Sequence, residues 1–141
     1  MCIPCPLCLF SYCLLPVWIQ AQTPETQPVQ AEVHDSVRIS NLLNLAFDHS
    51  RTDLEKAFSF LHQADSIYLS SGLQRLRPNI DYHYAVVHRN KGGFEQALLY
   101  TDAFLQEMRK RTDSLEIMKG LNVQTTIHYE QSDLHRLWKV P

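Results

Sequence analysis

The chain contains 141 residues, 45% of them hydrophobic and 20% charged, which is the length and composition of one folded domain with a modest core. Its formal net charge of −2 gives no positive field for nucleic acid or an anionic membrane, so we expect no nucleic-acid partner. The one cluster of like charge, Arg109-Lys110-Arg111, suits the last turn of a helix, where cations complement the helix dipole.

The first segment, residues 1–21, is apolar and uncharged and ends in a small residue, as a secretory signal peptide does. It holds all four cysteines, Cys2, Cys5, Cys8 and Cys13. Their spacing also permits a metal or iron–sulfur site, but this Leu-rich terminus offers no folded frame, so we expect no metal and no cofactor. About 20 apolar residues can also span a bilayer, so an uncleaved segment 1–21 would anchor the chain. We expect cleavage and an extracytoplasmic protein, periplasmic or secreted.

A flexible linker is expected next, over residues 22–34, because this stretch is polar and rich in Gln, Thr and Pro. Asp35 then suits the N-cap of a first helix, whose apolar residues recur at helical spacing in DSVRISNLLNLAFDHS. Thr52 and Glu55 have the spacing of a capping box, which predicts a second helix that runs to about Ser70. Gly72 stands where a C-terminal glycine belongs.

Three more helices are predicted after Gly72. Pro78 marks the first turn of the third, which ends at Gly92-Gly93, and the fourth is FEQALLYTDAFLQEMRKR. Asp113 and Glu116 form a second capping-box signal before the fifth helix, whose expected apolar stripe contains Leu115, Met118, Leu121 (or Asn122) and Thr125. No stretch alternates as a strand does, so we predict an all-α domain over residues 35–137 and a tail at 138–141.

The helices repeat one pattern. TDLEKAFSFLHQAD and GGFEQALLYTDAFL share a Glu-x-Ala core, and Ala57 and Ala97 lie 40 residues apart (97 − 57). Paired helices recur at a fixed period because each pair buries its apolar face only against the next pair. The residues assigned to this packing are Ala46, Ala57, Ala64, Ala85, Phe94, Ala97 and Phe104.

The second copy, YAVVHRNKGGFEQALLYTDAF, resembles a tetratricopeptide (TPR) repeat, with a small residue, a ring, a Gly turn and Glu-x-Ala. Residues 46–64 resemble a first repeat with a shorter turn, and TTIHYEQSDLHRL resembles the start of a third, with Leu137 in the place of Ala97. The resemblance implies an α-α superhelix of antiparallel helix pairs with about two and a half repeats. The period of 40 exceeds the usual value of about 34.

The period, the Asp-Ser-x-Arg opening and the apolar first segment are together similar to the extracytoplasmic repeats of bacterial sensor histidine kinases and helix-turn-helix regulators. The resemblance implies the sensory part of a signalling protein. Because no helix of comparable length follows the fifth, we expect its stripe to stay partly exposed. It would be covered by a second copy, in a homodimer through residues 114–137, or by the rest of a longer protein.

No catalytic grouping is found, so we expect a protein that is not an enzyme. The seven histidines include no pair at the spacing of a zinc protease, and His49 and His88 occupy ring positions in the repeat, so they are expected to pack between helices. Gly92-Gly93 lacks the lysine of a phosphate loop.

A binding groove is what the resemblance implies instead, along the first helix of each repeat. The family's groove positions fall on Asn79, Tyr82, Val86, Arg89 and Asn90 in the second repeat, and on Lys119, Asn122, Thr126 and Tyr129 in the third. Amides, cations and a ring suit a peptide with a carboxylate. We therefore expect a protein or peptide ligand. The alternatives are a dimerising signal-transduction subunit and a gene remnant without its output domain.

Overall fold

The computed structural model describes the backbone of residues 26–137 and the side chains of residues 30–132. This part of the chain is helical throughout and contains no strand, which confirms the predicted all-α class. The elements are α1 (Thr26–His49), α2 (Leu54–Ser71), the 3₁₀ helix η1 (Gln74–Leu76), α3 (Arg77–Lys91), α4 (Phe94–Arg111) and α5 (Ser114–Leu137). The segments assigned to a signal peptide (1–21) and a tail (138–141) lie outside the described residues.

The expected linker at 22–34 is wrong from Thr26 onward, because α1 already begins there. Pro28 falls in the first turn, where a missing N–H costs no helical hydrogen bond. Residues 30–34 are exposed, so the propensity of Gln, Ala and Glu, rather than burial, extends the helix. Asp35, the expected N-cap, lies inside α1 and pairs with Arg38 at 3.6 Å.

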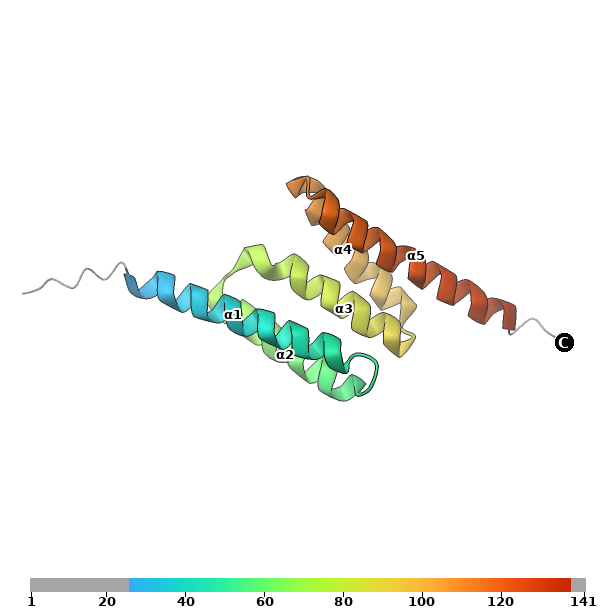
Figure 1. The fold of residues 1–141 in the computed structure, drawn as a ribbon, viewed down its shortest axis with the longest axis horizontal. Coiled ribbons are helices and arrows are strands. Elements are labelled where there is room, and N and C mark those ends of the chain that lie inside the picture. The colour runs from blue at the N-terminus through green and yellow to red at the C-terminus, as the bar shows by residue number, and fades with distance from the viewer. Residues whose placement is uncertain (1–25, 138–141) are drawn as a thin grey trace, which may run out of the picture.

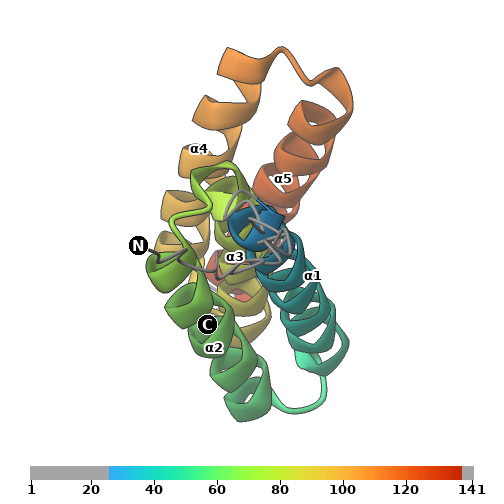
Figure 2. The same ribbon diagram turned by 90° about the vertical axis from the view of Figure 1, so that its left-hand side faces the viewer.

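The helices form two hairpins and one further helix (Figure 1). α1 packs along α2, α3 packs along α4, and α5 lies mainly against α4 with a smaller contact to α3. Figure 2 shows α2 and α4 on one side of α3, and α1 and α5 on the other side. Since α3 contacts both α1 and α5, these three helices share one face of the molecule.

The small residues that recur in the two repeats lie in the core. Ala46, Ala57, Ala64, Ala85 and Ala97 are each at most 1% exposed, so the helices of each hairpin approach closely at these positions. Of the two aromatic packing residues, Phe104 is buried and Phe94 is partly buried.

Arg77 ties the first hairpin to the second. Its guanidinium lies 3.0 Å from the carboxylate of Asp65 in α2 and 2.7 Å from that of Asp81 in α3. It also lies over the ring of Tyr68, 5.7 Å from its centroid. The α2–α3 connection is therefore held by an ion-pair group as well as by apolar contacts.

The helix ends follow local chemistry, with one shift. Gly72 and Gly92 have φ values of 67° and 81° at the ends of α2 and α3, a left-handed conformation that glycine adopts without strain. Asp113 accepts a hydrogen bond from Glu116 N at 3.1 Å and caps α5. The predicted Thr52 cap of α2 is wrong, because Asp53 accepts from Lys56 N at 3.1 Å and α2 begins one residue later.

The predicted packing stripe of α5 is also wrong. Gly120, Val123 and Ile127 are buried, whereas Leu115 and Met118 are 60% and 65% exposed. The reason is Gly120: a Cβ there would lie 2.6 Å from Leu105 Cδ2, so this is the side on which α5 approaches α4. α5 also continues unbroken to Leu137, so Leu137 lies in the same helix as Gly120, whereas its counterpart Ala97 lies in the second helix of a hairpin.

Candidate functional site

A cavity of about 400 Å³ opens on the face that α1, α3 and α5 share. In α1 and α5 the paired lining residues are three positions apart, and in α3 Tyr82 and His83 lie three and four positions after Asn79, so each set projects from one side of its helix. We call this cavity the α1–α3–α5 cleft, and its lining residues are Asn44, Phe47, Asn79, Tyr82, His83, Phe104, Glu116 and Lys119.

Rings form one wall of the cleft. His83 makes edge-to-face contacts with Phe47 and with Tyr82, with ring centroids 6.4 and 5.4 Å apart. Tyr82 in turn lies 5.3 Å from the ring of Phe104, which is 1% exposed and so belongs to the floor. Four rings from three helices thus give the cleft an apolar surface that an aliphatic or aromatic side chain can contact.

The imidazole of His83 is held in one tautomer. Its Nδ1 lies 2.7 Å from the backbone oxygen of Asn79. A carbonyl only accepts, so Nδ1 carries the proton and Nε2 is an acceptor. Burial lowers the pKa of His83 below the usual histidine value, although the hydrogen bond to Asn79 opposes this. His83 is therefore a neutral group near pH 7.

Polar groups stand at the rim of the cleft. Asn44 and Asn79 are exposed, and each amide offers a donor and an acceptor. The ammonium of Lys119 donates to the carboxylate of Glu116, and this hydrogen bond raises the pKa of Lys119. The cleft therefore presents two amides, one ion pair and one neutral imidazole around an aromatic surface.

Three of the sequence-predicted groove residues meet in the cleft: Asn79, Tyr82 and Lys119. Val86 does not reach it, because this side chain is 4% exposed and packs with Ala85, Ala97, Val123 and Ile127. The groove role predicted for Val86 is therefore wrong. Asn122, Thr126 and Tyr129 do not line the cleft, and the hydroxyl of Thr126 donates to the backbone oxygen of Asn122 at 2.8 Å.

Arg89 and Asn90 hold the helices together at the far end of the same face. Asn90 Nδ2 donates to Ser50 Oγ at 3.0 Å and to Ser50 O at 3.2 Å, and Arg89 donates to Asn90 Oδ1 at 3.0 Å. Arg89 Nε also lies 4.0 Å from Glu130 Oε2 in α5. Ser50, Asn90 and Glu130 follow one another at intervals of 40 residues (90 − 50 and 130 − 90). These contacts join α3 to Ser50, which directly follows α1, and to α5.

Sequence reasoning missed Asn44, Phe47, His83, Phe104 and Glu116 as members of the site. The sequence contained a signal for one of them, Phe47, because it corresponds to the predicted groove residue Val86. The offset between Ala46 and Ala85 is 39 residues (85 − 46), and the same offset carries His83 back to Asn44 and Val86 back to Phe47. The first repeat thus contributes Asn44 and Phe47 to the cleft, at positions that correspond to His83 and Val86 of the second repeat.

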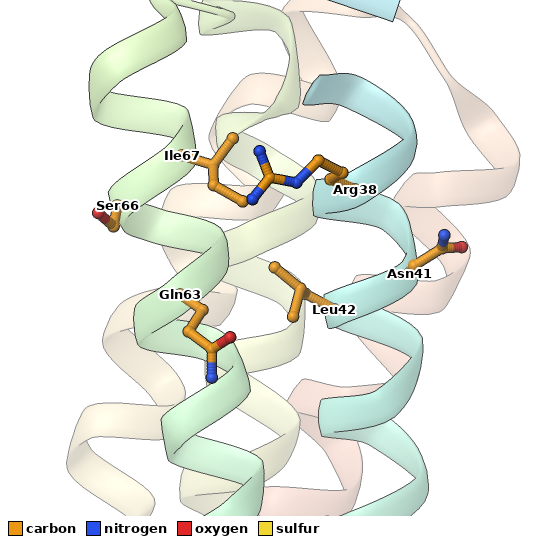
Figure 3. Close-up of a pocket in the computed structure, with 6 residues that line it drawn as sticks. All are labelled: Arg38, Asn41, Leu42, Gln63, Ser66 and Ile67. Carbon is orange, nitrogen blue, oxygen red and sulfur yellow. The ribbon is translucent and has the colours of Figure 1, made fainter. Parts of the chain in front are cut away.

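A second cavity, of about 420 Å³, lies between α1 and α2 alone (Figure 3). Its lining residues are Arg38, Asn41, Leu42, Gln63, Ser66 and Ile67. In Figure 3 Leu42 lies between the two helices, whereas Asn41 and Ser66 point outward. Only one hairpin forms this cavity, whereas the α1–α3–α5 cleft gathers side chains from different hairpins, so that cleft is the stronger candidate.

Histidines also pack between helices elsewhere, as expected for His49 and His88. The ring of His49 lies 5.7 Å from Phe60, and that of His88 lies 5.0 Å from Phe58 and 5.5 Å from Tyr100. Burial, followed by the charge of Lys91, lowers the pKa of His88.

We expect the free energy of unfolding to decrease as the pH falls from about 7.5 to about 5.5, through the ordinary histidine pKa of about 6.5. The pKa values of His83 and His88 are lowered in the folded chain, so below pH 6.5 the unfolded chain binds more protons than the native chain. Urea unfolding across this pH range measures the effect. The double variant His83→Gln/His88→Gln should show a flatter pH dependence, and exposed His34→Gln should match the parent. An unchanged slope in the double variant would contradict the assignment.

Comparisons with known proteins do not identify the site, so its assignment rests on the geometry of the lining residues. The chain matches no protein-family model, no curated protein and no solved structure. Within residues 26–137, no helix is long and apolar enough to cross a membrane. Among residues 30–132, whose side chains the structure describes, no group of three or more His, Cys, Asp or Glu is placed to hold a metal ion.

Proposed function

We propose that the chain is a non-catalytic recognition module, built of TPR-like helix pairs, that binds an extended peptide or protein segment in the α1–α3–α5 cleft. The observation that carries this proposal is the convergence of Asn44, Asn79, Tyr82, His83 and Lys119, from the alternate helices α1, α3 and α5, on one cavity of about 400 Å³. Paired helices at a 40-residue interval support the repeat assignment.

The chemistry of the cleft favours a peptide over a small charged metabolite. The Asn44 and Asn79 amides can pair with the N–H and C=O groups of an extended backbone. The ring wall beside them accepts one apolar side chain of the ligand, which would give most of the binding energy. A ligand carboxylate would replace Glu116 as the partner of Lys119.

The apolar segment 1–21 supports export, so the proposed setting is extracytoplasmic, periplasmic or secreted. In that setting the module would act as the sensory part of a signalling protein, as the resemblance to bacterial sensor repeats implies. Peptide binding in the cleft would then be the sensed event.

Selection from a phage-displayed library of random peptides of about 12 residues tests the proposal directly. We expect the full chain to enrich peptides that share one apolar anchor residue. Asn79→Ala and Lys119→Ala should each raise the Kd of an enriched peptide at least about fivefold. Isothermal titration calorimetry or fluorescence anisotropy measures these constants.

Matched controls come from the same residue types away from the cleft. Asn41→Ala and Lys110→Ala replace exposed side chains on α1 and α4 and should leave the Kd unchanged. Asn41 also lines the α1–α2 cavity, so a loss with Asn41→Ala and none with Asn79→Ala would move the site there. The absence of any enriched peptide would contradict the proposed function.

A further inference from the structure

α5 exposes an apolar stripe on the side opposite its contact with α4. Leu115, Met118, Leu121 and Tyr129 are 60%, 65%, 40% and 66% exposed. The buried residues Gly120, Val123 and Ile127 lie on the other side of the helix. With the exposed Asn122 and Thr125 between them, these six residues form what we call the α5 stripe: Leu115, Met118, Leu121, Asn122, Thr125 and Tyr129.

Over residues 114–132, whose side chains the structure describes, the exposed surface of α5 has few charged residues. Lys119 is the one exposed Lys, Arg, Asp or Glu in this range and belongs to the rim of the cleft, and the partly exposed Glu130 faces Arg89 of α3. By contrast α4, another amphipathic helix of this chain, exposes Glu95, Asp102, Arg109 and Lys110. A solvated helix face normally carries such charges. The α5 stripe therefore has the composition of a face that is covered in the assembled protein.

The internal repeat indicates what kind of element covers the stripe. An offset of 40 residues carries Tyr82 to Asn122 and Ala85 to Thr125 (82 + 40 and 85 + 40). In α3 the ring of Tyr82 lies 5.3 Å from that of Phe104 of α4, and Ala85 packs with Ala97 of α4. The stripe thus lies on the side of α5 that corresponds to the α4-covered side of α3. A helix is the element that fits it.

We propose that this helix is α5 of a second copy of the chain, packed antiparallel about a twofold axis. A twofold axis brings the same face of both copies together, and none of the six stripe residues carries a charge that would repel its counterpart. In the antiparallel register, Leu115 and Met118 lie opposite Tyr129 of the second copy. The smaller side chains Asn122 and Thr125 then lie near the axis, where amide and hydroxyl groups can hydrogen-bond across it.

The size of this contact suits a dimer of moderate affinity. A helix of 24 residues is about 36 Å long and roughly 10 Å across, so each copy would bury at most several hundred Å². This is the low end of the range for specific protein interfaces. Lys119 lies four positions after Leu115 and three before Asn122, so the stripe borders the rim of the α1–α3–α5 cleft. The dimer is tested by its mass and does not depend on the proposed peptide binding.

Sedimentation equilibrium of the full chain over a range of concentrations tests the dimer. We expect a concentration-dependent mass that approaches twice that of one chain. Met118→Glu should raise the dimer dissociation constant at least about tenfold, because it buries a carboxylate in the apolar contact. Leu99→Glu is the matched control: Leu99 is 62% exposed on α4, and its replacement should leave the constant unchanged. Circular dichroism of both variants confirms that each remains helical.

Mixing two variants tests the antiparallel register. Met118→Glu and Tyr129→Lys should each dimerise poorly alone. Mixed in equal amounts they should form a heterodimer, since one end gains a Glu–Lys pair and the other end keeps the original Met118–Tyr129 contact. Any of three results would overturn the proposal: a monomer at every concentration, equal weakening by Met118→Glu and Leu99→Glu, or head-to-tail assemblies larger than a dimer.

Discussion

Replacing Phe104 with alanine is expected to lower the free energy of unfolding by about 3–5 kcal/mol, the usual cost of removing a buried phenylalanine ring. Phe104 is 1% exposed and packs with Leu105 and Met108 in the part of the core that α3, α4 and α5 share. Its ring also supports Tyr82, with centroids 5.3 Å apart, so its loss should loosen the floor of the cleft. Urea unfolding monitored by circular dichroism measures the change.

The control for this prediction is Leu99→Ala on the same helix. Leu99 is 62% exposed, and its truncation should change stability by no more than about 0.5 kcal/mol. Similar losses for the two variants would mean that α4 is not packed between its neighbours as described.

Replacing Gly120 with valine is expected to destabilise the chain by about 3 kcal/mol and to detach α5. A Cβ at this position would lie 2.6 Å from Leu105 Cδ2, 2.9 Å from Leu105 Cγ and 3.0 Å from Phe104 Cδ1. Both neighbours are at most 1% exposed and have little room to move, so overpacking is costly. Gly120→Ala should cost less, since about 1 kcal/mol of gained helix propensity offsets part of the overlap. Differential scanning calorimetry ranks the variants.

Gly93→Ala is the matched glycine control. A Cβ at Gly93 would meet His88 at 3.5 Å, an ordinary contact, and φ at Gly93 is −83°, which alanine adopts readily. We therefore expect little change in the melting temperature. If Gly120→Val melts like the parent chain while Gly93→Ala does not, the close approach of α5 to α4 is wrong.

Helix ends were the most predictable part of the fold because they depend on a few adjacent residues. Gly72, Pro78, Gly92 and Asp113 mark the ends where the structure has them. The start of α1 was not predictable in the same way, since residues 30–34 extend the helix without any buried contact. Composition alone does not separate such a helical extension from a linker.

The packing face of α5 required knowledge of its neighbour. One side of its sequence places Leu115, Met118 and Leu121 at helical spacing, and the other places Val123 and Ile127. Periodicity alone favours the first side, which has more bulky apolar residues. The second side packs against α4 because Gly120 has no side chain there and leaves room for Leu105 and Phe104. This close approach can be recognised only from the structure of both helices.

The sequence predicted only those site residues that follow from aligning the repeats with one another, which we call the repeat register. The register places Asn79, Tyr82 and Lys119 on one face, and all three line the cleft. It also placed Val86 there, but the stacking of α5 on α4 brings Val123 and Ile127 against Val86 and buries it. Which register positions remain open therefore depends on how closely successive repeats pack.

The most direct test of the central claim is to locate where a library-selected peptide binds on the full chain. Backbone amide chemical shifts of the isotope-labelled chain, titrated with that peptide, give the location residue by residue. We predict that the largest changes fall around Asn44, Asn79, Tyr82, His83 and Lys119, in three helices at once. Changes confined to α2 and α4, or to the α1–α2 cavity around Asn41, would contradict the proposal that the α1–α3–α5 cleft is the binding site.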